Sequence, residues 1–137
     1  MPSLFEPLTF TRGPSMKNRF MLAPMTNTQS YRDGCLSDVE LNWIGMRASG
    51  GFGATMSAAA HVQANGQGFP GQLGIFSDDH IAGLTRMARM IKAHDSIAIV
   101  QLYHAGYQAP ATIISSTPVC PSDDPEFGAR ALTTGEV

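Results

Sequence analysis

The sequence predicts a parallel α/β fold of the kind that closes into a barrel, and three observations support this prediction. Short apolar segments alternate with segments of helical period, in the order strand, helix, strand, helix, strand. Strands joined by helices in this way lie parallel in one sheet, through right-handed crossovers. Two of the apolar segments lead into polar residues, Thr26 and Gln101, and such a barrel carries its chemistry at the C-terminal ends of its strands.

A small hairpin and a first strand are expected near the N-terminus. Residues 8–10 and 15–17 flank the segment 11–14, which contains a Gly-Pro turn signal. Residues 20–23 form a short apolar run that we interpret as the first buried strand. The strand ends at Pro24, because proline has no N–H group to donate to a β-ladder.

A polar loop over residues 27–36 leads to the first expected helix. Ser37 and Glu40 have the spacing of a capping box, in which the serine accepts a backbone hydrogen bond and the glutamate reaches back to the cap residue. The helix is expected to end at Gly50-Gly51, because glycine readily adopts the left-handed conformation that closes a helix. The apolar residues at helical spacing define its buried face: Leu41, Ile44 and Ala48.

Two more strands enclose a second expected helix. Residues 54–60 are small and apolar and predict the second strand, and a glycine-rich loop follows over 61–76. Ser77 caps the next helix, whose buried face is expected to carry Ile81, Leu84, Ala88 and Ile91. Residues 97–102 predict the third strand, which is apolar until Gln101, as buried parallel strands are.

The remainder of the sequence is expected to be irregular. Several prolines follow Gly106, and residues 133–136 repeat a capping-box pattern. A third helix would therefore start where the sequence stops. We expect residues 1–137 to be the N-terminal part of one barrel domain whose other strands lie outside this sequence.

Composition excludes several classes of partner. A net charge of −2 with scattered lysines and arginines argues against a nucleic-acid surface. No apolar run reaches the roughly 18 residues of a membrane helix, and no signal peptide is visible. The two cysteines, Cys35 and Cys120, have no metal-ligand or CxxC spacing. We therefore expect a cytoplasmic protein with free thiols, without a metal, a membrane or a nucleic acid as partner.

Polar residues at the strand ends are the first candidates for a binding site. Burying an unpaired amide costs on the order of 1–3 kcal/mol, so Gln101 needs a partner, which is either a ligand or the backbone of a neighbouring loop. The hydroxyl of Thr26 either contacts a ligand or caps a turn. His61 and His104 are interpreted as structural histidines, and His80 and His94 as surface residues. The sequence has no paired carboxylates, HExxH, GxSxG or P-loop pattern.

Several segments resemble the Old Yellow Enzyme family, whose members are FMN-dependent NAD(P)H oxidoreductases, or ene-reductases, on a TIM barrel. The resemblance covers nearly the whole chain in order. It is carried by Leu4-Phe5-Glu6-Pro7-Leu8, Lys17-Asn18-Arg19, Ala23-Pro24-Met25-Thr26, Arg47-Ala48, Gly50-Gly51, Gly66-Gln67-Gly68, Leu73-Gly74-Ile75 and Gln101-Leu102-Tyr103-His104-Ala105-Gly106. It implies an N-terminal β-hairpin and the first three βα-type units of an incomplete TIM (β/α)8 barrel.

The resemblance also implies a cofactor and roles for individual residues. FMN would pass hydride from NAD(P)H to an activated alkene or a similar acceptor. Pro24, Met25 and Thr26 would lie along the flavin ring, with Thr26 near its O4/N5 side. Ala59 would meet the ring edge through its backbone, and Gln101 would bind the pyrimidine part. The residues implied to face the substrate are Thr28 and Tyr103.

The chain departs from the family pattern in two respects. Tyr107 stands where the family often has arginine after His-Ala-Gly, so any contact from that arginine is lost. The histidine/asparagine pair that grips the substrate carbonyl, the proton-donating tyrosine and the phosphate-binding glycine loops match nothing here. No residue of this chain is therefore assigned a catalytic role, and the chain alone is expected to be inactive.

Two alternatives remain open at the level of sequence. A split or truncated barrel fragment could act as an assembly module, because open strand edges associate with a complementary fragment or a second copy. A tRNA dihydrouridine synthase-like FMN barrel also places Ala-Pro-Met near its first strand end. The acidic balance and the segments before the first strand count against that second alternative.

Overall fold

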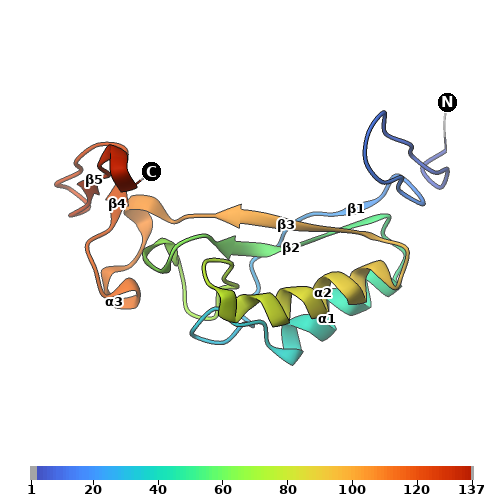
Figure 1. The fold of residues 1–137 in the computed structure, drawn as a ribbon, viewed down its shortest axis with the longest axis horizontal. Helices are drawn as coiled ribbons and strands as arrows, with labels where there is room; N and C mark the ends of the chain where they lie inside the picture. Colours follow the sequence, from blue (N-terminus) through green and yellow to red (C-terminus); the bar gives the residue numbers. More distant parts are fainter. Residues whose placement is uncertain (1–2, 137) are drawn as a thin grey trace.

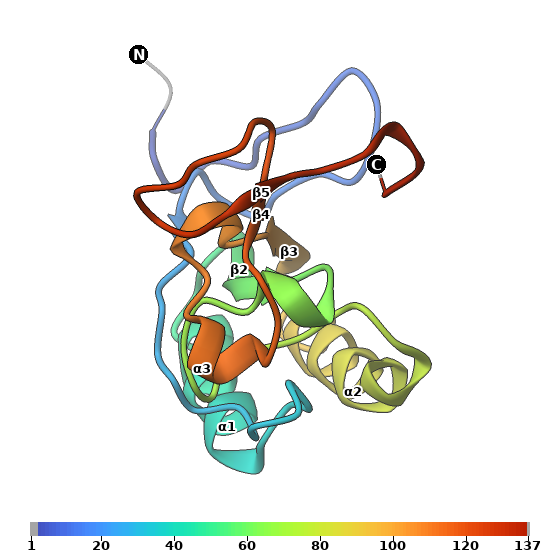
Figure 2. The same cartoon turned by 90° about the vertical axis from the view of Figure 1, so that its left-hand side faces the viewer.

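The computed structural model describes residues 3–136, which form a parallel α/β unit. Its three-stranded sheet has the order β1-β2-β3 with all neighbours parallel. Both long helices cover one face of this sheet (Figures 1 and 2). The main elements are β1 (Met21–Leu22), α1 (Asp38–Ser49), β2 (Ala54–His61), α2 (Ile81–Lys92) and β3 (Ile97–Tyr103). The predicted strand–helix alternation is confirmed.

The register of β2 and β3 shifts within the sheet. Ala54 pairs with Ile97, whereas Ala59 pairs with Gln101, so β2 holds one extra residue between these two pairs. Such an insertion is a β-bulge, which re-aims side chains at the end of a strand. The hydroxyl of Ser57 accepts a hydrogen bond from the backbone N–H of Gln101 at 3.2 Å. The side chain of Ser57 thus ties the two strands together at the irregularity.

The core lies between the sheet and the two helices. Its buried members are Leu36, Ile44, Ala48, Ala60, Leu73, Met87 and Ile91. The predicted burial of Ile44, Ala48 and Ile91 is confirmed. The prediction for Ile81 is wrong, because its side chain is 57% exposed. A 3₁₀ turn, η2 (Asp78–His80), precedes α2 and buries His80 in place of Ile81, so the expectation that His80 lies at the surface is also wrong.

The capping box at α1 is only half formed. Ser37 accepts a hydrogen bond from the backbone N–H of Glu40 at 3.1 Å, as predicted. The side chain of Glu40 does not reach back to the cap residue, so that part of the prediction is wrong. It turns inward, where it is fully buried beneath the loop 27–36 and accepts hydrogen bonds from Asn27 and Ser30.

The edges of the unit are less regular than the sequence predicts. The expected hairpin is a single antiparallel bridge between Leu8 and Met16, and the first strand comprises only the two residues of β1. β3 is half exposed, with Leu102 64% exposed, so the prediction of a fully buried strand is wrong. The reason is its position at an edge of the sheet, where no further strand pairs with it in residues 3–136.

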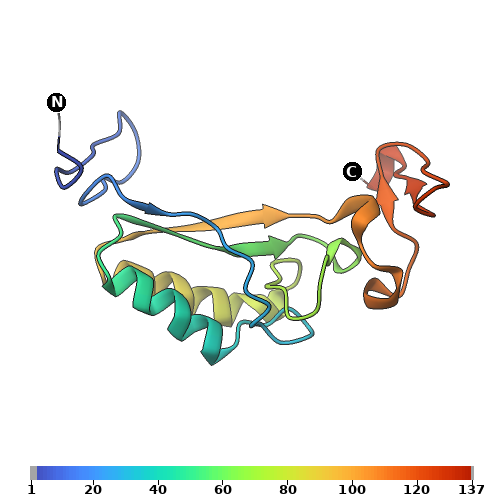
Figure 3. The same cartoon turned by 180° about the vertical axis from the view of Figure 1, so that it is seen from behind.

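Short elements follow β3. They are η3 (Gly106–Gln108), α3 (Ala111–Ile114), β4 (Val119–Cys120), β5 (Arg130–Ala131) and η4 (Thr134–Glu136), with β4 and β5 paired in parallel. This segment lies beyond the C-terminal ends of the strands, whereas the N-terminal coil lies at the opposite end (Figures 1 and 3). None of the helices formed by residues 3–136 is long and apolar enough to cross a membrane.

Candidate functional site

The C-terminal edge of the sheet brings the predicted site residues to one side of the unit. Thr26 follows β1, Ala59 lies near the end of β2, and Gln101 lies near the end of β3. Because the strands are parallel, these three positions meet at the same edge. β2 lies between the other two strands, so Thr26 and Gln101 are not on adjacent strands. Two strand spacings separate their strands, which is about 10 Å.

The segment after β1 is open to its surroundings. Met25 and Thr26 are exposed, and Pro24 is half-buried. Pro24 cannot donate a ladder hydrogen bond, and β1 stops two residues before it. Within the described chain, no hydrogen bond engages the hydroxyl of Thr26. Its polar atoms can therefore meet a ligand at the strand edge.

Ala59 is small and buried, and the side chain of Gln72 bonds to its backbone. Its carbonyl oxygen accepts a hydrogen bond from the side-chain amide of Gln72 at 3.2 Å. The same amide accepts a bond from the backbone N–H of Gly68 at 2.7 Å. Gln72 therefore fastens the glycine-rich loop to the end of β2. The sequence analysis missed this residue, and the only available signal was an amide beside the apolar run Leu73-Gly74-Ile75.

Gln101 is held by its backbone and leaves its side chain available. Its N–H donates to Ser57, as described above, while the residue is only half-buried. No hydrogen bond joins its side-chain amide to another residue between positions 3 and 136. Tyr103, two residues later, is the register partner of His61. A Cβ atom at Gly68 would lie 2.8 Å from the hydroxyl of Tyr103, so the glycine permits that close approach.

Thr28 has an unusual backbone. Its φ angle of 53° lies in the left-handed region, which β-branched residues rarely adopt. Strain of this kind persists only where surrounding contacts impose it, and it concentrates at functional sites. The side chain of Thr28 is exposed. Thr28 thus lies close to Thr26 in the chain, in a conformation that its neighbours must impose.

His61 is a buried histidine at the end of β2. The residue is only 1% exposed. The Nδ1 atom of its ring lies 2.9 Å from the carbonyl oxygen of Gln63. That contact assigns the ring proton to Nδ1, and Nε2 is buried without a partner in the described chain. Burial lowers the pKa of His61. The ring also packs against Phe76 at a centroid distance of 4.9 Å.

Acidification should destabilise the protein through His61. Its pKa is lowered in the folded state, so the unfolded chain binds more protons between the ordinary value, about 6.5, and the folded-state value. Stability therefore falls as the pH decreases through this window, by at most about 1.4 kcal/mol for each pH unit. Melting temperatures measured at pH 7 and pH 5 test this, and His61→Gln should reduce the difference between the two temperatures. The matched change at the exposed His94, His94→Gln, should leave it unchanged.

His104 lies at the point where β3 passes into the C-terminal segment. Its Nδ1 accepts a hydrogen bond from the backbone of Gly106 at 2.9 Å, which leaves Nε2 to donate to the amide oxygen of Gln63 at 3.1 Å. Burial lowers the pKa of His104, and both contacts suit its neutral form. The interpretation of His61 and His104 as hydrogen-bonded structural residues agrees with this geometry.

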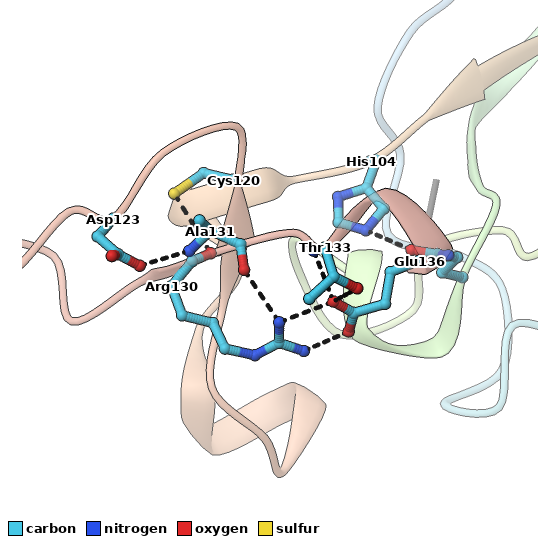
Figure 4. Close-up of polar contacts among 8 residues, drawn as sticks. His104, Cys120, Asp123, Arg130, Ala131, Thr133 and Glu136 are labelled. Atoms are coloured by element: carbon cyan, nitrogen blue, oxygen red, sulfur yellow. Dashed lines mark hydrogen bonds and ion pairs between the residues drawn. The ribbon is translucent and has the colours of Figure 1, made fainter.

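The C-terminal segment has its own polar contacts (Figure 4). Arg130 and Glu136 form an ion pair of 2.5 Å. Hydrogen bonds from Arg130 and from Thr133 lower the pKa of Glu136 to about 2. Because the pair is exposed, it contributes little to stability. The bond from the backbone N–H of Thr133 to Glu136 at 2.9 Å confirms one half of the capping box predicted there. The other half is wrong, because the hydroxyl of Thr133 donates to the carboxylate of Glu136, and only the 3₁₀ turn η4 follows.

An apolar recess lies away from this edge. It measures about 190 Å³, lies between α2 and β3, and is lined by Leu84, Met87, Ala88, Ile91, Ala98 and Val100, among others. These residues belong to the face that the helices cover. The recess contains no polar group suited to a cofactor, so the strand edge is the better candidate for chemistry.

Comparisons with known proteins agree with the geometry. Residues 3–137 match the model of a family described as the NADH:flavin oxidoreductase / NADH oxidase family. The probable NADH-dependent flavin oxidoreductase YqiG of Bacillus subtilis is 41% identical, over 98% of this chain and 37% of its own length. The NADH:acrylate oxidoreductase of Vibrio harveyi is 43% identical, over 80% of this chain and 11% of its own.

The fold has relatives among solved structures. The Old Yellow Enzyme homologue from Zymomonas mobilis superposes with a TM-score of 0.87 at 27% sequence identity. The superposition covers 98% of this chain and 41% of that one. The chain thus spans well under half the length of these relatives, and its sheet corresponds to part of their barrel. The match confirms the predicted fold, an incomplete portion of a TIM barrel.

Proposed function

The chain belongs to the NADH:flavin oxidoreductase / NADH oxidase family, and we propose that it supplies part of the flavin site of an Old Yellow Enzyme-type oxidoreductase. In this proposal residues 1–137 are the N-terminal part of a single FMN-binding barrel domain. One observation carries the proposal. Thr26, Ala59 and Gln101 meet at the C-terminal edge of a parallel sheet, where barrel enzymes bind their ligands.

The chemistry of these residues fits FMN. The pyrimidine half of a flavin has an amide-like edge with alternating donors and acceptors, and an amide such as that of Gln101 can match it. The hydroxyl of Thr26 can donate near O4 and N5, where negative charge develops. Ala59 is small enough to let a flat ring approach the backbone. Pro24 and Met25 would complete the ring contact from the first strand.

The cofactor defines the reaction that we propose. FMN, when bound, accepts hydride from NAD(P)H and passes it to an activated double bond or similar acceptor. The residues of this chain would hold and orient the flavin, while Thr28 and Tyr103 would line the substrate side. YqiG is named as an NADH-dependent flavin oxidoreductase and the Vibrio relative as acting on acrylate. The name of the Vibrio relative supports an unsaturated small molecule as acceptor, and α,β-unsaturated carboxylates are the first candidates.

The activity requires a complete barrel. β3 exposes Val100 and Leu102, which are 37% and 64% exposed, and an unpaired apolar strand is a surface for association. We propose that the remaining strands and helices of the barrel cover it, and that the complete protein forms oligomers. The isolated segment 1–137 should be inactive and should self-associate. The free thiols of Cys35 and Cys120 support a reducing, cytoplasmic location.

The test is an anaerobic titration of the complete, purified protein. NADH and NADPH are added separately, and the absorbance of oxidised FMN is followed. We expect bleaching by at least one of them, and recovery of the absorbance when acrylate, fumarate or cyclohexenone is added. A complete protein that binds no flavin, or a bound flavin that neither nucleotide reduces, would contradict the proposal.

A further inference from the structure

Glu40 is a fully buried carboxylate without a cationic partner. Its side chain is 0% exposed, and the ion pairs within residues 3–136 are those of Arg86 with Asp38 and Arg130 with Glu136. Its partners are neutral: the amide of Asn27 donates to Oε1 at 3.2 Å, and the hydroxyl of Ser30 donates to Oε2. Burying a charged group is costly unless its hydrogen bonds are made. A carboxylate in the first turn of a helix is favoured by the helix dipole wherever it points, so the inward direction of Glu40 has to be explained by the loop that it contacts.

That loop is fixed by contacts on both sides of Thr28. The side-chain oxygen of Asn27 accepts a bond from the backbone of Gln29 at 3.1 Å. The carbonyl oxygen of Gln29 accepts a bond from Ser37 at 2.5 Å, and the backbone N–H of Ser30 donates to Gly71 at 3.0 Å. Glu40 binds the two residues that flank this stretch, Asn27 and Ser30. It therefore joins helix α1 to both ends of the segment that holds Thr28 at its positive φ angle.

We infer that Glu40 is the positioning residue of the segment 27–30, and that by holding this segment it orients Thr28 and the adjoining Thr26 toward the substrate and the flavin. This inference rests on the proposed function. Glu40 touches neither ligand itself and acts through Asn27 and Ser30. A carboxylate suits the task because both of its oxygens accept, whereas an amide can accept at only one. Glutamine at position 40 would keep one accepting oxygen, so either Asn27 would meet its NH₂ group or Ser30 would have to accept instead of donating.

An exchange of the two functional groups tests this directly. Glu40→Gln leaves only one accepting oxygen for two donors: with that oxygen on Ser30, two donors face each other at Asn27, because Asn27 already uses its oxygen for Gln29, and with it on Asn27, the Ser30 hydroxyl must accept instead of donating. Adding Asn27→Asp restores the match: the amide introduced at position 40 can donate to the carboxylate introduced at position 27. The single and double variants form a cycle that isolates the contact. Ile44→Val weakens the packing of the same helix without touching the loop and serves as the stability-matched control.

Two measurements on the complete protein separate positioning from simple destabilisation. The first is amide hydrogen exchange of the Ser30 N–H without FMN, which should be about tenfold faster in Glu40→Gln and return to within about twofold of wild type in the double variant. The second is the FMN dissociation constant, which should rise about tenfold and recover in the same way. The ratio of kcat to KM for the acceptor should fall in Glu40→Gln and recover in the double variant. Ile44→Val should lower the melting temperature and leave both measurements unchanged.

The outcomes distinguish this inference from the proposed function. If Glu40→Gln leaves exchange at Ser30 and FMN affinity unchanged, or if adding Asn27→Asp fails to restore them, the inference is wrong. If the wild-type protein binds no FMN, the proposed function is wrong, and the exchange rates still decide whether Glu40 holds the segment. Should Glu40→Gln not fold, Ser30→Ala removes one donor and leaves the carboxylate, and it should raise the FMN dissociation constant without the loss of folding.

Discussion

Replacing Gly71 with alanine is expected to destabilise the complete protein by about 3 kcal/mol and to weaken FMN binding severely. Gly71 has a φ angle of +72°, which already disfavours a side chain. A Cβ atom there would also lie 2.5 Å from the carbonyl oxygen of Thr28 and 2.9 Å from its carbon. These are backbone atoms, so a rotamer change cannot relieve the clash. The segment of Thr28 must move, and with it the first strand end of the candidate site.

A matched glycine separates the two causes. Gly128 has a φ angle of +64°, and a Cβ atom there would meet nothing within 4 Å. Gly128→Ala should therefore cost only the backbone strain, about 1 kcal/mol, and should leave FMN affinity unchanged. Chemical denaturation and flavin-fluorescence titration of both variants provide the comparison. Equal losses of stability in the two variants would show that a side chain at position 71 does not clash with the backbone of Thr28.

The parts of the fold that the sequence predicts are those with local causes. The strand–helix order follows from apolar periodicity, which needs no knowledge of distant residues. Ser37 was identifiable as a cap because its bond partner is three residues away. Pro24 excludes a longer β1 for a reason contained in the residue itself, although the strand already ends at Leu22. The parallel edge that gathers Thr26, Ala59 and Gln101 follows from the same order.

The parts that the sequence does not predict depend on contacts between distant segments. Glu40 has the spacing of a capping residue, yet the loop before the helix folds over it and donates hydrogen bonds to both of its carboxylate oxygens. Gln72 binds across to β2, and no local pattern marks it. His80 is buried because its Nε2 lies 3.1 Å from the carbonyl oxygen of Asp33, far away in the sequence. In each case a polar side chain has a tertiary partner, which single-sequence patterns do not contain.

Gln101 shows how the two kinds of information combine. The sequence indicates that an amide inside an apolar strand needs a partner, and it leaves open whether the partner is a ligand or a loop. In the structure the backbone of Gln101 bonds to Ser57, while none of residues 3–136 hydrogen-bonds its side chain. The residue is half-buried at an open strand edge. Residues 3–136 thus supply no hydrogen-bond partner from a loop, and a flavin as the partner of Gln101 stays a prediction.

Gln101→Leu should accordingly separate binding from stability. Leucine has a similar size and removes every donor and acceptor of the side chain, while the backbone bond to Ser57 is retained. Because no side-chain hydrogen bond within residues 3–136 is lost, the melting temperature should stay within about 2 °C of wild type. The FMN dissociation constant should rise about tenfold to a hundredfold, the cost of leaving the flavin's pyrimidine edge without its partner.

The controls for Gln101 test where the flavin lies. Gln108→Leu makes the same chemical change at an exposed position after β3 and should leave FMN affinity unchanged. Gln101→Glu keeps the shape and one type of acceptor but loses the N–H donors, so its effect should be at least as large as that of leucine at neutral pH. If Gln101→Leu binds FMN as tightly as the wild type, the third strand end does not contact the pyrimidine ring. The flavin would then have to be held by residues outside this edge, and the assignment of Thr26 and Ala59 would lose its geometric basis.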